Sequence, residues 1–167
     1  MNESAPWFFI RPSSGSTEYP GLVEIWRSSV RATHDFLDEK DFERIEASLI
    51  PVYFPAVAML VADTDDGPVG FAGVAEGCLE MLFVSDSARG RGVGTALLHE
   101  AVARYGVTEV DVNEQNTGAL GFYLSQGFVQ VGRSELDGDG RPYPLLHLRR
   151  AVTRGSNPDH GPVARDR

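Results

Sequence analysis

A glycine-arginine turn at residues 89–94, Arg-Gly-Arg-Gly-Val-Gly, is the feature that most constrains the fold of this chain. The apolar run Leu79–Val84 enters the turn, and a segment with helical apolar spacing, Val93–Tyr105, leaves it. Glycines let backbone N–H groups approach a ligand closely, and a helix start adds free N–H donors. Arg89 and Arg91 add guanidinium donors that suit phosphate. The turn therefore predicts a phosphate site, with a flexible strand-to-helix connection as the alternative.

Two common phosphate loops do not fit this turn. A Walker loop requires Gly-Lys-Ser/Thr, whereas Thr95 follows Gly94 directly. A dinucleotide fingerprint requires a glycine three positions after its second one, and Thr95 occupies that position after Gly92. The pattern that remains is Arg-x-x-Gly-x-Gly, from Arg89 through Gly92 to Gly94.

This pattern resembles the pyrophosphate loop of the GNAT superfamily of acyl-CoA-dependent N-acetyltransferases, which reads Gln/Arg-x-x-Gly-x-Gly/Ala between a strand and a helix. A second signature of the superfamily is Asn-x-x-Ala-x-x-x-Tyr-x-x-x-Gly-Phe. It is matched downstream by Asn116, Ala119, Tyr123 and the pair Gly127-Phe128. Two patterns in the right order, a helix and a strand apart, are far more specific than either alone.

The rest of the chain alternates between strand-like and helix-like segments. Runs rich in β-formers predict strands at residues 7–11, 57–62, 69–74, 79–84, 107–112, 128–135 and 143–149. Helical spacing, caps and breakers predict helices at residues 22–32, 38–50, 93–105 and 116–126. The strand–helix–strand unit around the glycine-arginine turn implies two parallel neighbouring strands.

This order of elements is that of the GNAT superfamily, so the resemblance covers roughly residues 7–150. It implies an α/β (α+β) fold, with a mixed, mostly antiparallel sheet of six to seven strands and about four helices. It also implies a central, splayed pair of parallel strands. The strings at residues 32–37 and 141–145 further resemble the bacterial YjaB subgroup. We expect one domain over residues 1–150 and a disordered polar tail over residues 151–167.

The composition is that of an ordinary globular protein, with 42% hydrophobic and 23% charged residues among 167. The net charge of −9 argues against nucleic acid or an anionic membrane surface as a partner and suits an amine-bearing one. The single cysteine, Cys78, excludes an internal disulfide and a multi-cysteine metal site, and we expect a buried, inert thiol. No signal peptide or membrane span is recognisable, so we expect a cytoplasmic protein without a metal.

The resemblance assigns residues to the binding of acetyl-CoA. In the superfamily the strand before the loop contacts the pantetheine arm through its backbone, the loop binds the pyrophosphate, and the second signature lies beside the pantetheine. By position these cofactor residues are Leu82, Phe83, Val84, Arg89, Gly90, Arg91, Gly92, Val93, Gly94, Thr95, Asn116, Ala119 and Tyr123.

Acetyl transfer to an amine also needs a proton donor for the departing sulfur and a base for the amine. The resemblance makes Tyr123 the general acid; the alternative is a tyrosine that only packs beneath the cofactor. For the base, Glu80 lies on the strand that carries an acid in several GNAT enzymes, and His34 and Glu114 compete with it. These three residues, with Asn113 and Tyr143, are the expected acceptor-site residues.

The leading interpretation is an enzyme that moves the acetyl group of acetyl-CoA to a primary amine in a ternary complex. A non-catalytic acyl-CoA sensor or regulatory module is the alternative. A toxin that acetylates aminoacyl-tRNA is disfavoured by the net charge. The sequence leaves open whether the acceptor is an amino acid, polyamine, antibiotic, peptide N-terminus or lysine, and whether the protein is a homodimer.

Overall fold

A single sheet forms the centre of the molecule, and its strands come from both sides of the glycine-arginine turn in the sequence. The computed structural model describes residues 5–151, so the tail expected beyond them lies outside the described part. Within it the chain forms seven strands: β1 Phe9–Pro12, β2 Ala58–Thr64, β3 Gly67–Ala75, β4 Cys78–Val84, β5 Glu109–Asn113, β6 Phe128–Ser134 and β7 Leu145–Arg150.

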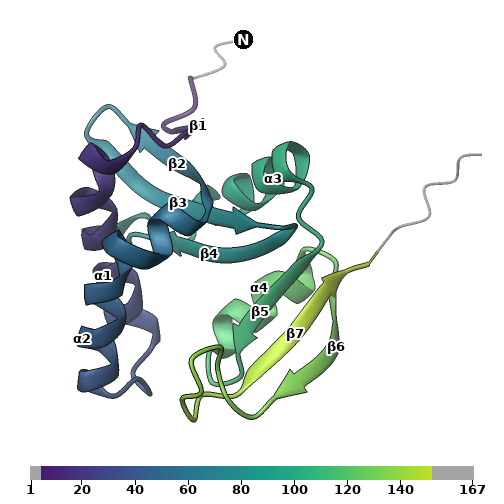
Figure 1. Ribbon diagram of the computed structural model, residues 1–167. Helices are drawn as coiled ribbons and strands as arrows, with labels where there is room; N and C mark the ends of the chain where they lie inside the picture. The colour runs from purple at the N-terminus through teal and green to yellow at the C-terminus, as the bar shows by residue number, and fades with distance from the viewer. Residues whose placement is uncertain (1–4, 152–167) are drawn as a thin grey trace, which may run out of the picture.

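The strands are ordered β1-β2-β3-β4-β5-β7-β6 (Figure 1). Every neighbouring pair is antiparallel except β4 and β5, which run parallel. The mixed, mostly antiparallel sheet with a central parallel pair is therefore confirmed.

The parallel pair separates almost as soon as it forms. Only Cys78 with Glu109 and Leu79 with Val110 are in register, and beyond them the two strands diverge (Figure 1). On the other side, β4 stays paired with β3, with one extra residue at Glu80, because Leu79 and Met81 face consecutive residues of β3. The backbone of β4 after Leu79 thus has one edge without a partner strand.

The four α-helices cover both faces of the sheet: α1 Tyr19–Thr33, α2 Glu39–Ser48, α3 Val93–Tyr105 and α4 Thr117–Ser125. The expected caps are present, since Asp38 accepts the N–H of Lys40 at 2.7 Å before α2. The sequence predicts a helix up to residue 50, before Pro51, whereas α2 ends two residues earlier, at Ser48. A π-helical turn, Leu49–Tyr53, and a 3-10 turn, Phe54–Ala56, follow Ser48 directly.

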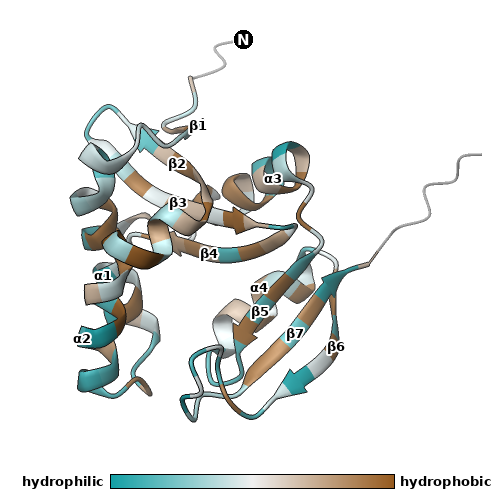
Figure 2. Cartoon of the chain, viewed as in Figure 1, coloured by the Kyte–Doolittle hydropathy of each residue, from teal (hydrophilic) through white to brown (hydrophobic). Residues whose placement is uncertain are grey.

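Two hydrophobic cores hold these layers together. One contains α3, α4 and the side chains of the sheet that face them, with Leu97 and Phe128 among its buried residues. The other lies under α1 and α2, where Trp26 and Phe42 stack with ring centroids 4.8 Å apart. Figure 2 shows the apolar residues along the strands and on these helices. No helix within residues 5–151 has the length and apolarity needed to cross a membrane.

The loop between β6 and β7, residues 135–144, is here called the strap, because it reaches back to the first half of the chain. The Tyr143 hydroxyl donates to Asp41 of α2 at 2.5 Å. The Tyr53 hydroxyl, from the turns after α2, donates to Asp139 of the strap at 3.0 Å. The two parts of the splayed sheet are therefore joined a second time, away from the parallel pair.

Candidate active site

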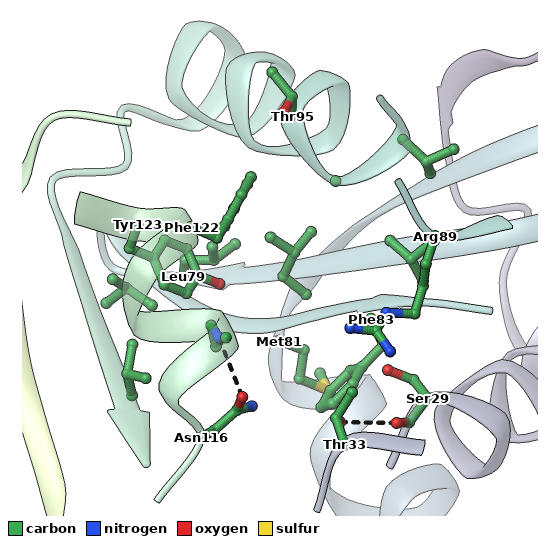
Figure 3. A pocket seen from close by; sticks show the side chains of 18 of the residues that line it. Ser29, Thr33, Leu79, Met81, Phe83, Arg89, Thr95, Asn116, Phe122 and Tyr123 are labelled. Atoms are coloured by element: carbon green, nitrogen blue, oxygen red, sulfur yellow. Dashed lines mark hydrogen bonds between the residues drawn. The ribbon is translucent and has the colours of Figure 1, made fainter. Parts of the chain in front are cut away.

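A cavity of about 380 Å³ lies at the splay, between β4, β5, the start of α3, α4 and the end of α1 (Figure 3). All the residues that the sequence predicts to bind the cofactor line it, except Arg91. It is also lined by residues that sequence reasoning missed, and these include Ser29, Thr33, Asp111, Gly118 and Phe122.

The glycine-arginine turn presents backbone donors to this cavity. Gly90 and Gly92 have φ angles of 73° and 88°, which L-residues rarely adopt, and Gly92 stands directly before α3. The first helical N–H to find an acceptor is that of Ala96, which donates to the Gly92 carbonyl at 3.1 Å. The N–H groups of residues 93–95 thus have no acceptor in the helix and face the site. This arrangement suits a diphosphate.

The two arginines of the turn differ in their surroundings. Arg89 lines the cavity, with its guanidinium 3.5 Å from the Asp86 carboxylate. Arg91 instead lies over the Trp7 ring, 3.8 Å from its centroid, and does not line the cavity. Spacing alone could not distinguish them, because Trp7 comes from the other end of the chain.

The open edge of β4 forms one wall of the cavity. Leu82, Phe83 and Val84 line it and pair only with β3, opposite Ala72, Phe71 and Gly70. Their backbone groups on the side of β5 have no strand partner, so they are available to an extended amide-containing ligand.

Tyr123 reaches into the cavity from α4 (Figure 3). Its side chain is only 7% exposed, and its ring packs edge-on against Phe122 and Phe128. Within residues 5–151 its hydroxyl makes no hydrogen bond. Burial raises the pKa of Tyr123 above its ordinary value. The phenol therefore stays protonated at neutral pH, and the raised pKa also makes it a weaker acid than an ordinary tyrosine.

Asn116 and His34 meet at the mouth of the cavity. The Asn116 side chain accepts the N–H of Ala119 at 3.1 Å as the cap of α4, and its amide lies 3.5 Å from His34 Nε2. His34 Nδ1 lies 2.7 Å from the Thr33 hydroxyl. Burial lowers the pKa of His34, so the ring is neutral at physiological pH.

Glu80 and Asp111 bring two carboxylates to the splay from β4 and β5, and both line the cavity. Partial burial, and then the charge of Asp111, raise the pKa of Glu80. A raised pKa makes Glu80 a stronger base than an ordinary glutamate. Two negative groups beside each other also form a site that favours a cationic acceptor.

Asp111 belongs to a row of hydrogen-bonded side chains across β5, β7 and β6. His147 Nδ1 lies 2.6 Å from an Asp111 oxygen, and His147 Nε2 lies 2.6 Å from the Ser134 hydroxyl. The row fixes the orientation of the Asp111 carboxylate. Its signal in the sequence is the alternation of polar residues with valine in Glu109–Asn113, which predicts a polar strand face but not the neighbour across the splay.

The remaining acceptor-site expectations fall in different places. Asn113 lines the cavity, and its side chain accepts the N–H of Gln115 at 2.9 Å. Glu114 is paired with Arg133 at 2.9 Å and lies outside the cavity. Tyr143 is also outside it, since its hydroxyl is engaged by Asp41.

Cys78 departs from the expectation of a buried thiol, because it is half-buried where β4 and β5 meet. Burial, and then the charges of Glu80, Asp111 and Glu109, raise the pKa of Cys78 to about 12. The thiol therefore stays protonated at neutral pH, as expected of an inert cysteine.

Comparisons with known proteins agree with this geometry. The acetyltransferase (GNAT) domain family matches residues 55–130. The peptidyl-lysine N-acetyltransferase YjaB of Salmonella typhimurium is 44% identical over 128 residues, which are 76% of this chain and 88% of that protein.

Two solved structures extend the comparison. The solution structure of apo YjaB from Escherichia coli has a TM-score of 0.78 and 39% identity, covering 86% of this chain and 97% of that one. The PaiA N-acetyltransferase of Thermoplasma acidophilum, solved with coenzyme A, shares the fold at a TM-score of 0.61 and 20% identity, over 86% and 98% of the two chains.

The loop at the start of α3, the open edge of β4 and the length of the match to YjaB lead to one conclusion. This chain belongs to the GNAT family and is an N-acetyltransferase that uses acetyl-CoA.

Proposed function

We propose that the enzyme acetylates the ε-amine of lysine side chains in proteins or peptides. The observation that carries this proposal is that one cavity at the open edge of β4 is lined by two carboxylates, Glu80 and Asp111, and by a phenol, Tyr123, so that a place for a cationic amine and a proton donor belong to the same site. The activity for which the YjaB relatives are named, peptidyl-lysine N-acetylation, supports the same acceptor.

The binding roles follow from the backbone. When bound, acetyl-CoA supplies an activated acetyl thioester. The N–H groups of residues 93–95, with Arg89, bind the diphosphate, and the free edge of Leu82–Val84 orients the pantetheine arm. Asn116 completes this wall while it caps α4.

The proton transfers are assigned by environment. Glu80, with its raised pKa, accepts the proton of the lysine ammonium, directly or through water. Tyr123, whose protonated phenol lines the same cavity, donates a proton to the sulfur as it leaves. His34 is the second candidate base, because it is neutral and lines the same cavity, although its partners are Thr33 and Asn116.

A non-catalytic acyl-CoA sensor is the rival function, and a direct assay distinguishes the two. The protein is incubated with acetyl-CoA and a lysine peptide whose N-terminus is blocked. Free thiol and acetylated peptide are then measured together. We expect both to form in equal amounts, and Glu80→Gln to lower turnover while coenzyme A affinity stays nearly unchanged. Tight binding of acetyl-CoA without thiol release, with lysine peptides and with small amines, would favour the sensor.

The compartment follows from this activity. We propose that the enzyme works in the cytoplasm, where acetyl-CoA and protein lysines are both present.

A further inference from the structure

We propose that the enzyme selects lysines that have a large apolar residue within two positions in the peptide, and that this residue binds in a second cavity beside Glu80. The inference rests on the proposed lysine acetylation and adds a sequence preference to it.

The second cavity has a volume of about 350 Å³ and lies between α1, α2, the turns after α2 and β4. Its walls are aromatic and aliphatic, with Trp26, Leu49, Tyr53, Val57 and Phe83 among them. Among residues 5–151, Glu80 is the only charged one in its lining. A cavity of this size and lining suits an apolar group much larger than the stem of a lysine.

The two cavities share a wall. Glu80, Met81 and Phe83 line both of them, so Glu80 stands where the cofactor cavity and the apolar cavity meet. An amine that reaches Glu80 therefore has the apolar cavity immediately beside it. The occupants implied are an amine and an apolar group on the same molecule.

A peptide provides both groups when it binds in an extended conformation. Side chains two residues apart point to the same side of an extended chain and are separated by roughly 7 Å. A lysine directed to Glu80 thus places a neighbouring side chain at the apolar cavity. A residue at an adjacent position reaches it if the chain bends at the site.

The walls of the apolar cavity are formed before any substrate arrives. Trp26 is 3% exposed and stacks on Phe42, and Leu49 is 2% exposed. Tyr53 is tied to Asp139 of the strap through its hydroxyl. Walls held by the core keep their shape, so an apolar side chain binds without a large ordering cost.

The test uses blocked pentapeptides with a central lysine. One peptide has glycine at all four flanking positions, and the others carry a single phenylalanine at one of them. We expect at least one phenylalanine peptide to exceed the glycine peptide in kcat/KM by roughly 10- to 150-fold, as burial of a phenylalanine side chain implies.

A variant then assigns the preference to the cavity. Ala56 lines the cavity and is exposed, so Ala56→Phe fills the space from its rim. We expect the ratio of kcat/KM between the two peptides to fall towards one in this variant. Ala47→Phe is the matched control, because Ala47 is an exposed alanine of α2 outside this cavity, and it should keep the ratio. Ala75→Leu, also in the cavity lining, serves as a second filling variant if Ala56→Phe does not fold.

The outcomes separate the two levels of the proposal. If all peptides are acetylated equally well, the sequence preference is wrong and lysine acetylation stands. A preference that survives in folded Ala56→Phe, or in Ala75→Leu where Ala56→Phe does not fold, overturns the assignment to this cavity. If no lysine peptide is acetylated, the proposed function fails and the inference fails with it.

Discussion

Tyr123 combines a polar group with the surroundings of a core residue. Its ring is packed between Phe122 and Phe128, yet its hydroxyl has no hydrogen-bond partner within residues 5–151. Packing fixes the ring, and the unsatisfied hydroxyl remains free for a ligand. A residue that only packed would lose little by becoming phenylalanine, and this difference defines a test.

Tyr123→Phe should lower kcat by roughly 10²- to 10⁴-fold, because it removes the general acid and keeps the ring. Coenzyme A affinity, measured by calorimetry, should change little. Tyr105→Phe is the control, since Tyr105 packs against the same core from α3 without lining the cavity. A Tyr123→Phe enzyme with near-normal kcat would make Tyr123 a packing residue.

Asp111→Asn should shift the acidic limb of the pH profile to lower pH. The negative charge of Asp111 raises the pKa of Glu80, so its removal lowers that pKa. Because a base loses activity as the pH falls through its pKa, the variant should stay active at lower pH. Glu109→Gln, on the same strand but paired with Arg149, should leave the limb in place. An unchanged limb in Asp111→Asn would exclude Glu80 as the titrating base.

At the level of elements, α3 begins abruptly at the edge of the cavity. Its N-cap, Gly92, has a left-handed backbone conformation, and the second residue of the helix, Gly94, is again a glycine. A Cβ on Gly94 would lie 3.8 Å from both Phe122 and Val84, which are lining residues, so a longer side chain there would extend into the cavity. The glycine thus weakens the helix and keeps space for the ligand.

Gly94→Leu should separate these two effects. Leucine is a better helix former than glycine by about 0.5–1 kcal/mol, so the melting temperature should stay the same or rise. Coenzyme A affinity should fall sharply, because the side chain occupies the place of the diphosphate and the upper pantetheine arm. Gly94→Ala is the matched control, since its Cβ makes only ordinary contacts. Calorimetry that showed unchanged affinity in a folded Gly94→Leu protein would move the binding site elsewhere.

On the scale of the whole molecule, the strap links the two parts of the splayed sheet. Tyr143 is buried, donates to Asp41 and accepts the N–H of Asp38 at 3.2 Å. Arg141, in the same strap, lies between Asp41 and Asp139. These contacts bind the loop between β6 and β7 to the start of α2.

Tyr143→Phe should lower the free energy of unfolding by about 1–3 kcal/mol, because it removes one hydrogen bond to Asp41, which keeps Arg141, and leaves the Asp38 N–H without its acceptor. Urea denaturation measures this loss, with Tyr105→Phe as the control. Turnover under conditions where both proteins are folded should be little changed. A variant of full stability and reduced turnover would restore the acceptor role that the sequence first suggested for Tyr143.

The sequence predicts those parts of the molecule that local chemistry determines. Helix ends follow from caps such as Asp38, and the loop at Gly92 follows from its glycines. The partners of Arg91, Glu114 and Tyr143 could not be predicted, because each contact joins residues far apart in the chain. Whether a polar residue on a strand reaches the site depends on register and splay, which no local pattern encodes.

Because β4 and β5 diverge, the backbone of β4 at the centre of the sheet lacks a partner strand on one side. In the proposed binding mode the pantetheine arm takes the place of that missing strand and completes the hydrogen bonding of β4. The ligand is then part of the folded structure, so it stabilises the protein by mass action, by about 2.7 kcal/mol at a hundred times its Kd. The resistance of the enzyme to unfolding and proteolysis would therefore rise and fall with the supply of acetyl-CoA.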